Sequence, residues 1–209
     1  MEHPTVSNEE MQTRIVRFAD VPGRGMPLMF IDSILPGHQR MNYSLVGDTA
    51  SENPEFDPLI TAPHKFQIGM VKAMPGNGPA YHTHDYIESF FILTGRWRFY
   101  WGNSPDTIDG ESILGPWDYI SLPPGLYRGF EVHKDETDEA WLFAVLEPHE
   151  VFASKDPYWA PSVEQEAAQH GFRADTRGKM VKPEQYDTLR VDLMRKLNDA
   201  LPAAKEGTP

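Results

Sequence analysis

The sequence contains no cysteine, which excludes disulfides, thiolate metal sites and cysteine nucleophiles. Basic residues are also scarce, with 19 Lys and Arg against 31 Asp and Glu and a formal net charge of −12. Nucleic acids and anionic membranes select basic surfaces, so we expect neither as a partner. There is no apolar run long enough to span a bilayer, and no recognisable secretory signal. We therefore expect a cytoplasmic protein.

Turn-forming residues are plentiful, with 19 Pro and 16 Gly. Short apolar runs separated by these turns predict strands at residues 14–19, 28–35, 40–46, 66–74, 81–93, 97–101, 118–121, 127–133 and 141–147. Many short strands of this kind indicate a β-sandwich or barrel. Lys72 stands near the end of one run and is expected at the rim.

The sequence pattern changes from strand-like to helix-like after residue 148. Helices are predicted at 162–170, stopping at Gly171, and at 183–201, where apolar residues recur every three or four positions. We expect this amphipathic stripe to pack against the β-structure or against a second subunit. Three parts follow: an N-terminal extension with strands (1–63), a barrel (64–150) and a C-terminal helical extension (151–209).

The strongest local signal is the group His82, His84 and Glu88, inside a strand-like run. Every second side chain of a β-strand points to the same face, so these three would share one interior with Tyr86. Two imidazoles and a carboxylate on one face form a site for a divalent metal. An internal hydrogen-bond network is the alternative, because buried imidazoles and carboxylates need partners.

The same segment fits the pattern G-x5-H-x-H-x3-E-x6-G, at Gly76, His82, His84, Glu88 and Gly95. In this it resembles the first motif of the cupin superfamily, over about residues 64–150. The resemblance implies an all-β, cupin-like double-stranded β-helix (a jelly-roll barrel) with the ligands inside, an N-terminal strand extension and C-terminal helices. Cupins of this size commonly pair, so a homodimer is expected.

The second cupin motif is incomplete. Pro123 and Gly125 are present, but Trp117 replaces the first glycine and Arg128 replaces the closing histidine. In metal-binding cupins that histidine is the last protein ligand. If Arg128 faces inward, strand alternation turns His133 outward, so His133 cannot simply replace the missing ligand.

Two arrangements remain open. In the first, His82, His84 and Glu88 hold a metal, with Fe(II) favoured and Mn, Ni, Co or Zn acceptable, and Arg128 holds an anionic substrate on the open side. In the second, Arg128 pairs with Glu88 and metal binding is weak or lost.

The first arrangement predicts a metal-dependent cupin enzyme, with a dioxygenase-type oxidation or cleavage of a small organic acid or oxygenated aromatic. There Arg128 would neutralise the developing anion, and Tyr86 would donate a proton. The second predicts a metal-free or weakly metal-binding cupin: a module for a small anionic ligand, or an isomerase or lyase in which His82 or His84 moves protons.

Overall fold

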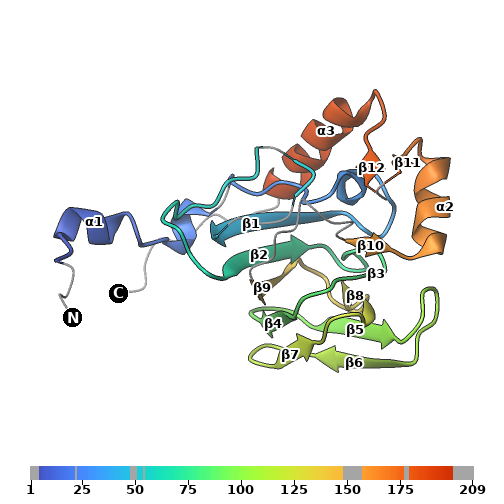
Figure 1. Ribbon diagram of the computed structural model, residues 1–209, viewed down its shortest axis with the longest axis horizontal. Coiled ribbons are helices and arrows are strands. Elements are labelled where there is room, and N and C mark those ends of the chain that lie inside the picture. Colours follow the sequence, from blue (N-terminus) through green and yellow to red (C-terminus); the bar gives the residue numbers. More distant parts are fainter. Residues whose placement is uncertain are drawn as a thin grey trace.

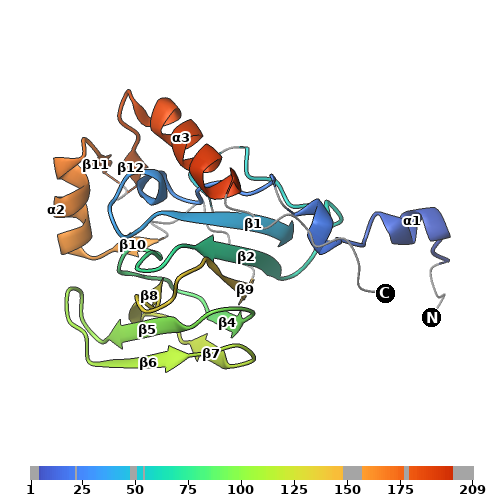
Figure 2. The same ribbon diagram turned by 180° about the vertical axis from the view of Figure 1, so that it is seen from behind.

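Two five-stranded antiparallel sheets form the body of the protein (Figures 1 and 2). The computed structural model describes residues 5–21, 23–47, 51–53, 55–147, 157–176 and 179–199. Sheet A contains, in spatial order, β1 (Arg40–Val46), β2 (Gln67–Ala73), β9 (Ala140–Leu146), β4 (Glu88–Ile92) and β7 (Tyr119–Leu122). Sheet B contains β10 (Tyr158–Trp159), β3 (His82–Thr83), β8 (Tyr127–Val132), β5 (Trp97–Gly102) and β6 (Gly110–Leu114). The predicted all-β jelly roll is confirmed.

Both sheets contribute to one apolar core. Phe90 of sheet A packs against Phe99 and Phe130 of sheet B, with ring centroids 5.6 and 4.6 Å apart. Trp97 and Phe99 alternate with more exposed residues along β5, which is the period of two that a strand requires. The buried aromatic rings therefore fix which face of each strand looks inward, and with it the register of the site residues.

Helical elements cover the outside. They are α1 (Asn8–Gln12), η1 (Phe18–Asp20), η2 (Phe30–Ser33), α2 (Pro161–Gln169) and α3 (Tyr186–Asp199), and a small third sheet joins β11 (Arg173–Ala174) to β12 (Met180–Val181). Figure 1 shows α3 lying over β1, and Leu193 and Leu197 pack there with Met41 and Tyr43. The amphipathic stripe thus packs against sheet A. Among the described residues, no helix is long and apolar enough to cross a membrane.

Both flanking parts add a strand to the sheets. β1, from the N-terminal part, pairs with β2, and β10, from the C-terminal part, pairs with β3. β6, β10, β11 and β12 were not predicted from the sequence. The division into three parts and the homodimer stay predictions.

Two predicted N-terminal strands are wrong. Residues 14–19 form turns that lead into η1, and residues 28–35 contain η2. In the second case the Asp32 carboxylate accepts a hydrogen bond from the Met29 amide at 3.0 Å, which closes a helical turn. The apolar residues there do not alternate, and Asp32 and Ser33 interrupt them, so periodicity alone could not separate a strand from a turn.

The prediction of one strand at residues 81–93 is also wrong. β3 belongs to sheet B and β4 to sheet A, and residues 84–87 between them are not in a strand. This segment crosses from one sheet to the other, which matters for the site described below.

Three glycines of the sequence motifs stand where the backbone takes a left-handed conformation. Gly76, Gly95 and Gly125 have φ angles of +74°, +66° and +77°. This left-handed region is strained for residues that carry a Cβ. Trp117, which stands at a glycine position of the second motif, takes φ +76° and is 80% exposed. The backbone at Trp117 therefore lies in the same left-handed region as those glycines.

Lys72 is not at the rim, and that prediction is wrong. Its side chain is fully buried, and Nζ donates a hydrogen bond of 2.6 Å to the Leu197 carbonyl. Carbonyls in the last turn of a helix have no partner within the helix, so Lys72 caps α3 from the sheet. Burial lowers the pKa of Lys72.

Glu52 joins the two flanking parts. Its carboxylate accepts hydrogen bonds from the amides of Phe30 in η2, at 2.7 Å, and Met180 in β12, at 3.2 Å. Burial is the largest influence on this group and raises its pKa from 4.5 to about 7. Because its pKa is raised in the folded state, neutral Glu52 stabilises the fold at low pH. This contribution is lost as the pH rises from about 4.5 through about 7.

We therefore expect Glu52→Gln to change the pH dependence of unfolding. The difference in thermal midpoint, variant minus parent, should grow between pH 5 and pH 8, because only the parent ionises a buried carboxylate over that range. Glu55→Gln, at an exposed position nearby, is the control and should show no such trend. A gap for Glu52→Gln that is constant with pH would contradict this assignment.

Candidate metal centre

His82, His84 and Glu88 come together although they do not share one strand. His82 lies in β3 of sheet B and Glu88 begins β4 of sheet A. All three side chains are buried, and one potential ligand atom from each lies within 4.8 Å of the others. Convergence therefore results from the chain crossing between the sheets, and not from side-chain alternation along a single strand as the sequence analysis assumed.

The two histidines are already spaced for a shared cation. Their Nε2 atoms are 3.0 Å apart, and Nδ1 of His82 lies 2.6 Å from the Ala80 carbonyl oxygen. A carbonyl can only accept, so Nδ1 carries the proton and Nε2 of His82 presents a lone pair. Two donors at right angles around a metal, with bonds of about 2.1 Å, lie about 3.0 Å apart. The histidine pair thus fits a metal without rearrangement.

The environment keeps His82 neutral. Burial lowers its pKa well below the usual 6.5, and the charges of His84 and Arg128 lower it further. Because the folded-state pKa is depressed, the stability linked to neutral His82 is present above about pH 6.5 and is lost as the pH falls toward the folded pKa. The neutral imidazole is also the form that binds metals.

Aromatic rings hold both imidazoles in place. The Trp159 ring meets His82 edge-on, with centroids 5.7 Å apart. Tyr86 stacks on His84 at 4.6 Å with an interplanar angle of 22° and is itself buried. The sequence analysis expected Tyr86 to face the same interior, and its ring does lie against the histidine pair.

Glu88 is shared between the histidines and Arg128. Its Oε2 lies 4.0 Å from Nε2 of His84 and 3.5 Å from Nε of Arg128. The carboxylate would have to approach His84 by about 1 Å to sit beside it on one metal. The structure therefore contains a part of each arrangement that the sequence left open. The histidine pair is spaced as in the metal-binding arrangement, and Arg128 is paired with Glu88 as in the other.

Arg128 is fully buried beside Glu88. It is the register partner of His82, and its Nη1 donates a hydrogen bond to the Leu126 carbonyl at 3.0 Å. A guanidinium near a divalent cation is repelled unless an anion lies between them. The Glu88 carboxylate can be that anion, because its Oε2 faces both Arg128 and His84.

Unpartnered atoms support a metal at this point. Glu88 Oε2 and Arg128 Nη2 are buried, and neither has a hydrogen-bond partner among the described residues. A buried polar atom without a partner is costly, and ligation of a cation by the carboxylate would remove that cost for Oε2. By donor type and burial the three residues fit a divalent cation, with the Glu88 carboxylate moved toward His84 by about 1 Å.

A small cavity of about 30 Å³ opens over the histidines. We call it the inner cavity; its lining is Leu28, Met29, Arg40, His82, His84, Tyr86, Leu146, Pro157 and Trp159. Sequence reasoning missed Arg40, because it lies in the N-terminal extension, outside both motifs. The one signal for it was a basic residue at the start of a strand that is otherwise buried.

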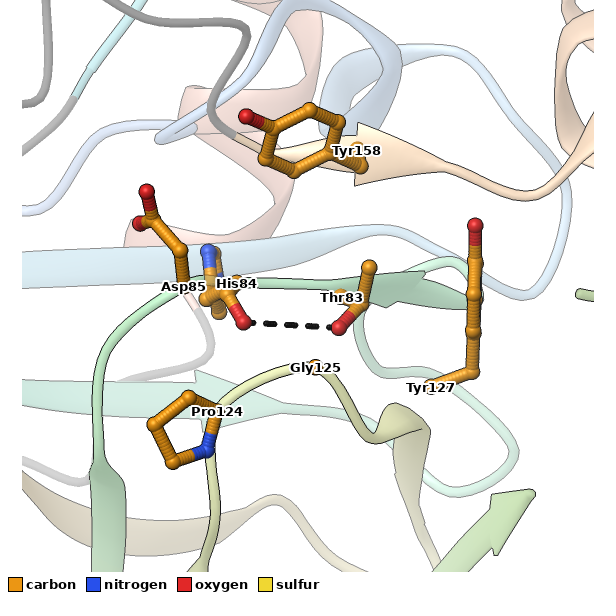
Figure 3. A pocket seen from close by; sticks show the side chains of 7 residues that line it. All are labelled: Thr83, His84, Asp85, Pro124, Gly125, Tyr127 and Tyr158. Atoms are coloured by element: carbon orange, nitrogen blue, oxygen red, sulfur yellow. Dashed lines mark hydrogen bonds between the residues drawn. The ribbon is translucent and has the colours of Figure 1, made fainter. Parts of the chain in front are cut away.

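A larger, open groove of about 460 Å³ lies nearby (Figure 3). It is lined by Thr83, His84, Asp85, Pro124, Gly125, Tyr127 and Tyr158, so it shares only His84 with the inner cavity. The groove is larger, but both histidines line the inner cavity and only His84 lines the groove.

Other histidines lie elsewhere. His133 is partly exposed, 3.7 Å from Asp135, so it faces outward as expected. Nδ1 of His64 lies 2.6 Å from the Ala62 carbonyl oxygen. His149 is outside the described residues.

No model of a known protein family matches this chain, and no curated protein matches it. Solved structures of similar fold include a candidate sugar phosphate isomerase from Acidithiobacillus ferrooxidans, at 16% identity and TM-score 0.48, with 67% of this chain and 78% of that one covered. A cupin-2 domain from Rhodospirillum rubrum follows, at 11% identity, TM-score 0.45 and coverages of 75% and 80%. The polyketide cyclase RemF from Streptomyces resistomycificus is similar at 19% identity, TM-score 0.43 and coverages of 64% and 78%.

These similarities concern the fold. These structures are at most 19% identical to the chain and their TM-scores are below 0.5, so they carry no argument about its family. The resemblance to the cupin superfamily rests on the first sequence motif, whose His82, His84 and Glu88 come together between the two antiparallel sheets. The activity has to be argued from the site itself.

The place of Arg128 in the site can be tested by restoring the missing histidine. We expect Arg128→His to bind Mn(II) or Zn(II) more tightly, by roughly tenfold or more, because a cation is removed and a ligand added beside His82. Competition against a chelating dye measures this. Arg98→His, on a half-exposed arginine paired with Glu111 and Glu131, is the control. Equal affinities in both variants would show that position 128 does not reach the metal.

Proposed function

We propose that this protein is a metal-dependent enzyme acting on a small organic acid, with His82, His84 and Glu88 as the metal ligands. The observation that carries the proposal is the buried histidine pair, with Nε2 atoms 3.0 Å apart and Nδ1 of His82 2.6 Å from the Ala80 carbonyl oxygen. Fe(II) is the favoured metal, because two histidines and one carboxylate leave several positions open; Mn, Ni, Co or Zn also accept these ligands.

The charges around the site favour an anionic substrate. Arg40 is paired with Asp32 at 3.2 Å and Arg128 with Glu88 at 3.5 Å, so these four side chains sum to no net charge. A divalent cation would leave the group with an excess of two positive charges in a buried setting. Such an excess attracts an anion strongly where the dielectric constant is low.

Bound Fe(II) would supply open coordination positions for substrate and dioxygen side by side, which is the basis of a dioxygenase-type oxidation or cleavage. Arg128 would hold the Glu88 carboxylate in place, and Tyr86, stacked on His84, would donate a proton from its hydroxyl. The apolar walls of the inner cavity, among them Leu146 and Met29, would keep bulk water out.

Metal content is the first test. Protein purified without a histidine tag should carry about one metal ion per chain by elemental analysis, and His82→Ala/His84→Ala should carry almost none. The matched control is His64→Ala/His133→Ala, which removes two histidines outside the inner cavity and should keep the metal. Equal loss of metal from both double variants would contradict the ligand assignment.

A second candidate function rests on the direct contacts between the site residues. His82 already contacts His84, and Glu88 already contacts Arg128, so the polar groups are partly satisfied by one another. This favours a weakly metal-binding module for a small anion, or an isomerase or lyase in which a histidine moves the proton.

Oxygen uptake separates the two functions. Fe(II)-loaded protein is screened against small organic acids with an oxygen electrode, and product is followed in parallel under nitrogen. The first proposal predicts uptake that requires Fe(II) and is lost in His82→Ala. Turnover under nitrogen by metal-free protein would instead support the isomerase or lyase.

A further inference from the structure

Arg40 is the charged side chain best placed to meet a ligand in the inner cavity. It begins β1, beside Ala73 of β2, and lines the inner cavity together with both histidines. Because β1 belongs to the N-terminal extension, a residue outside the motif-bearing barrel strands is thereby added to the site.

The other arginine is differently engaged. Arg128 has no exposed surface and does not line the inner cavity; its guanidinium contacts Glu88 and the Leu126 carbonyl. Arg128 also contacts the Thr83 hydroxyl, at 3.4 Å, and it does not touch a ligand held in the inner cavity. Arg40, in contrast, is itself part of the cavity wall.

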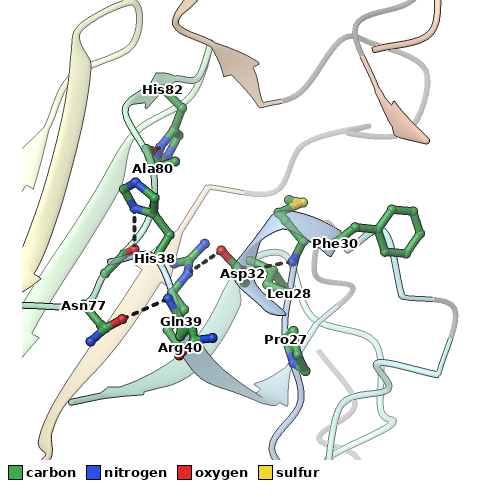
Figure 4. Close-up of polar contacts among 12 residues, drawn as sticks. Pro27, Leu28, Phe30, Asp32, His38, Gln39, Arg40, Asn77, Ala80 and His82 are labelled. Carbon is green, nitrogen blue, oxygen red and sulfur yellow. Dashed lines mark hydrogen bonds and ion pairs between the residues drawn. The ribbon is translucent and has the colours of Figure 1, made fainter. Parts of the chain in front are cut away.

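Asp32 fixes Arg40 but leaves it able to bind more. The contact within the described part of the chain runs from Nε of Arg40 to Oδ1 of Asp32, at 3.2 Å, and Asp32 is in turn held by the Met29 amide (Figure 4). A guanidinium has two further nitrogens in a planar fork, the geometry that matches a carboxylate.

The remaining lining also points to an acidic ligand. The indole Nε1 of Trp159 is buried and has no hydrogen-bond partner among the described residues. An indole nitrogen only donates hydrogen bonds, as a guanidinium does. A ligand that satisfies these groups must therefore carry hydrogen-bond acceptors. Leu28, Met29, Leu146 and Pro157 add apolar wall for a short carbon chain.

Size limits the ligand further. About 30 Å³ has room for roughly two water molecules, so only a small polar group such as a carboxylate enters without movement of the walls. In a 2-oxo or 2-hydroxy acid the second oxygen is on the carbon next to the carboxylate, so both can reach one cation within that space. An aromatic ring does not fit without movement of the walls.

We propose that Arg40 binds the carboxylate of the substrate in the inner cavity and selects short 2-oxo or 2-hydroxy acids. The inference rests on the proposed function for the second oxygen, which would lie toward the metal. The contact between Arg40 and the carboxylate requires only the protein.

The test measures binding, not turnover. Calorimetry with pyruvate, and with uncharged pyruvamide as the control ligand, is run anaerobically on metal-free and Mn(II)-loaded protein. Arg40→Gln/Asp32→Asn, which removes both members of the ion pair together and avoids a lone buried charge, should bind pyruvate roughly 10- to 100-fold more weakly in either state. Arg98→Gln should bind as the parent does.

Asp32→Asn alone distinguishes a ligand contact from a structural role. With its partner neutralised, Arg40 should bind pyruvate more tightly than in the parent, whereas a merely structural pair predicts equal or weaker binding. The proposal is overturned if the parent protein prefers pyruvamide to pyruvate. It is also overturned if the Arg40→Gln/Asp32→Asn variant binds pyruvate as tightly as the parent does. So does the absence of pyruvate binding in every form.

The two proposals fail separately. If metal analysis finds no bound metal but pyruvate binding still depends on Arg40, the carboxylate contact stands and the metal-dependent function falls. If metal binds to His82, His84 and Glu88 but the Arg40 variant binds pyruvate like the parent, the metal site stands and the Arg40 contact falls.

Discussion

A fully buried guanidinium, Arg128, sets the main constraint on this protein, because a charge removed from water needs a partner of opposite sign. Glu88 supplies it at 3.5 Å, and the same carboxylate faces His84 at 4.0 Å. The carboxylate therefore faces both a fixed positive charge and the histidine pair. A cation beside the histidines would be separated from Arg128 by that carboxylate, which makes their coexistence physically reasonable.

The site exists only because the two sheets meet. Sheet B carries His82, sheet A carries Glu88, and the segment between them crosses over with His84 in it. The flanking parts then close the inner cavity with Arg40 from β1 and Trp159 from β10. These flanks are consequently part of the site and not only a covering for the barrel.

Much of this was readable in the sequence, because a motif with fixed spacing reports backbone turns as well as ligands. The convergence of the three site residues followed from it. The N-terminal turns did not, since the apolar residues of 14–19 and 28–35 show no consistent period. Nor did buried Lys72 and Arg40, whose partners Leu197 and Asp32 are chosen by tertiary packing. Strand alternation predicted that these three residues lie together, but they do so because the chain crosses between the sheets.

The most direct test of the account is a crystal structure of Mn(II)-loaded protein with anomalous scattering measured at the manganese edge. The account predicts one strong peak within about 2.3 Å of Nε2 of His82, Nε2 of His84 and an oxygen of Glu88, with Arg128 on the far side of the carboxylate. A peak elsewhere, or none while the Arg128–Glu88 pair remains as it is, would contradict it.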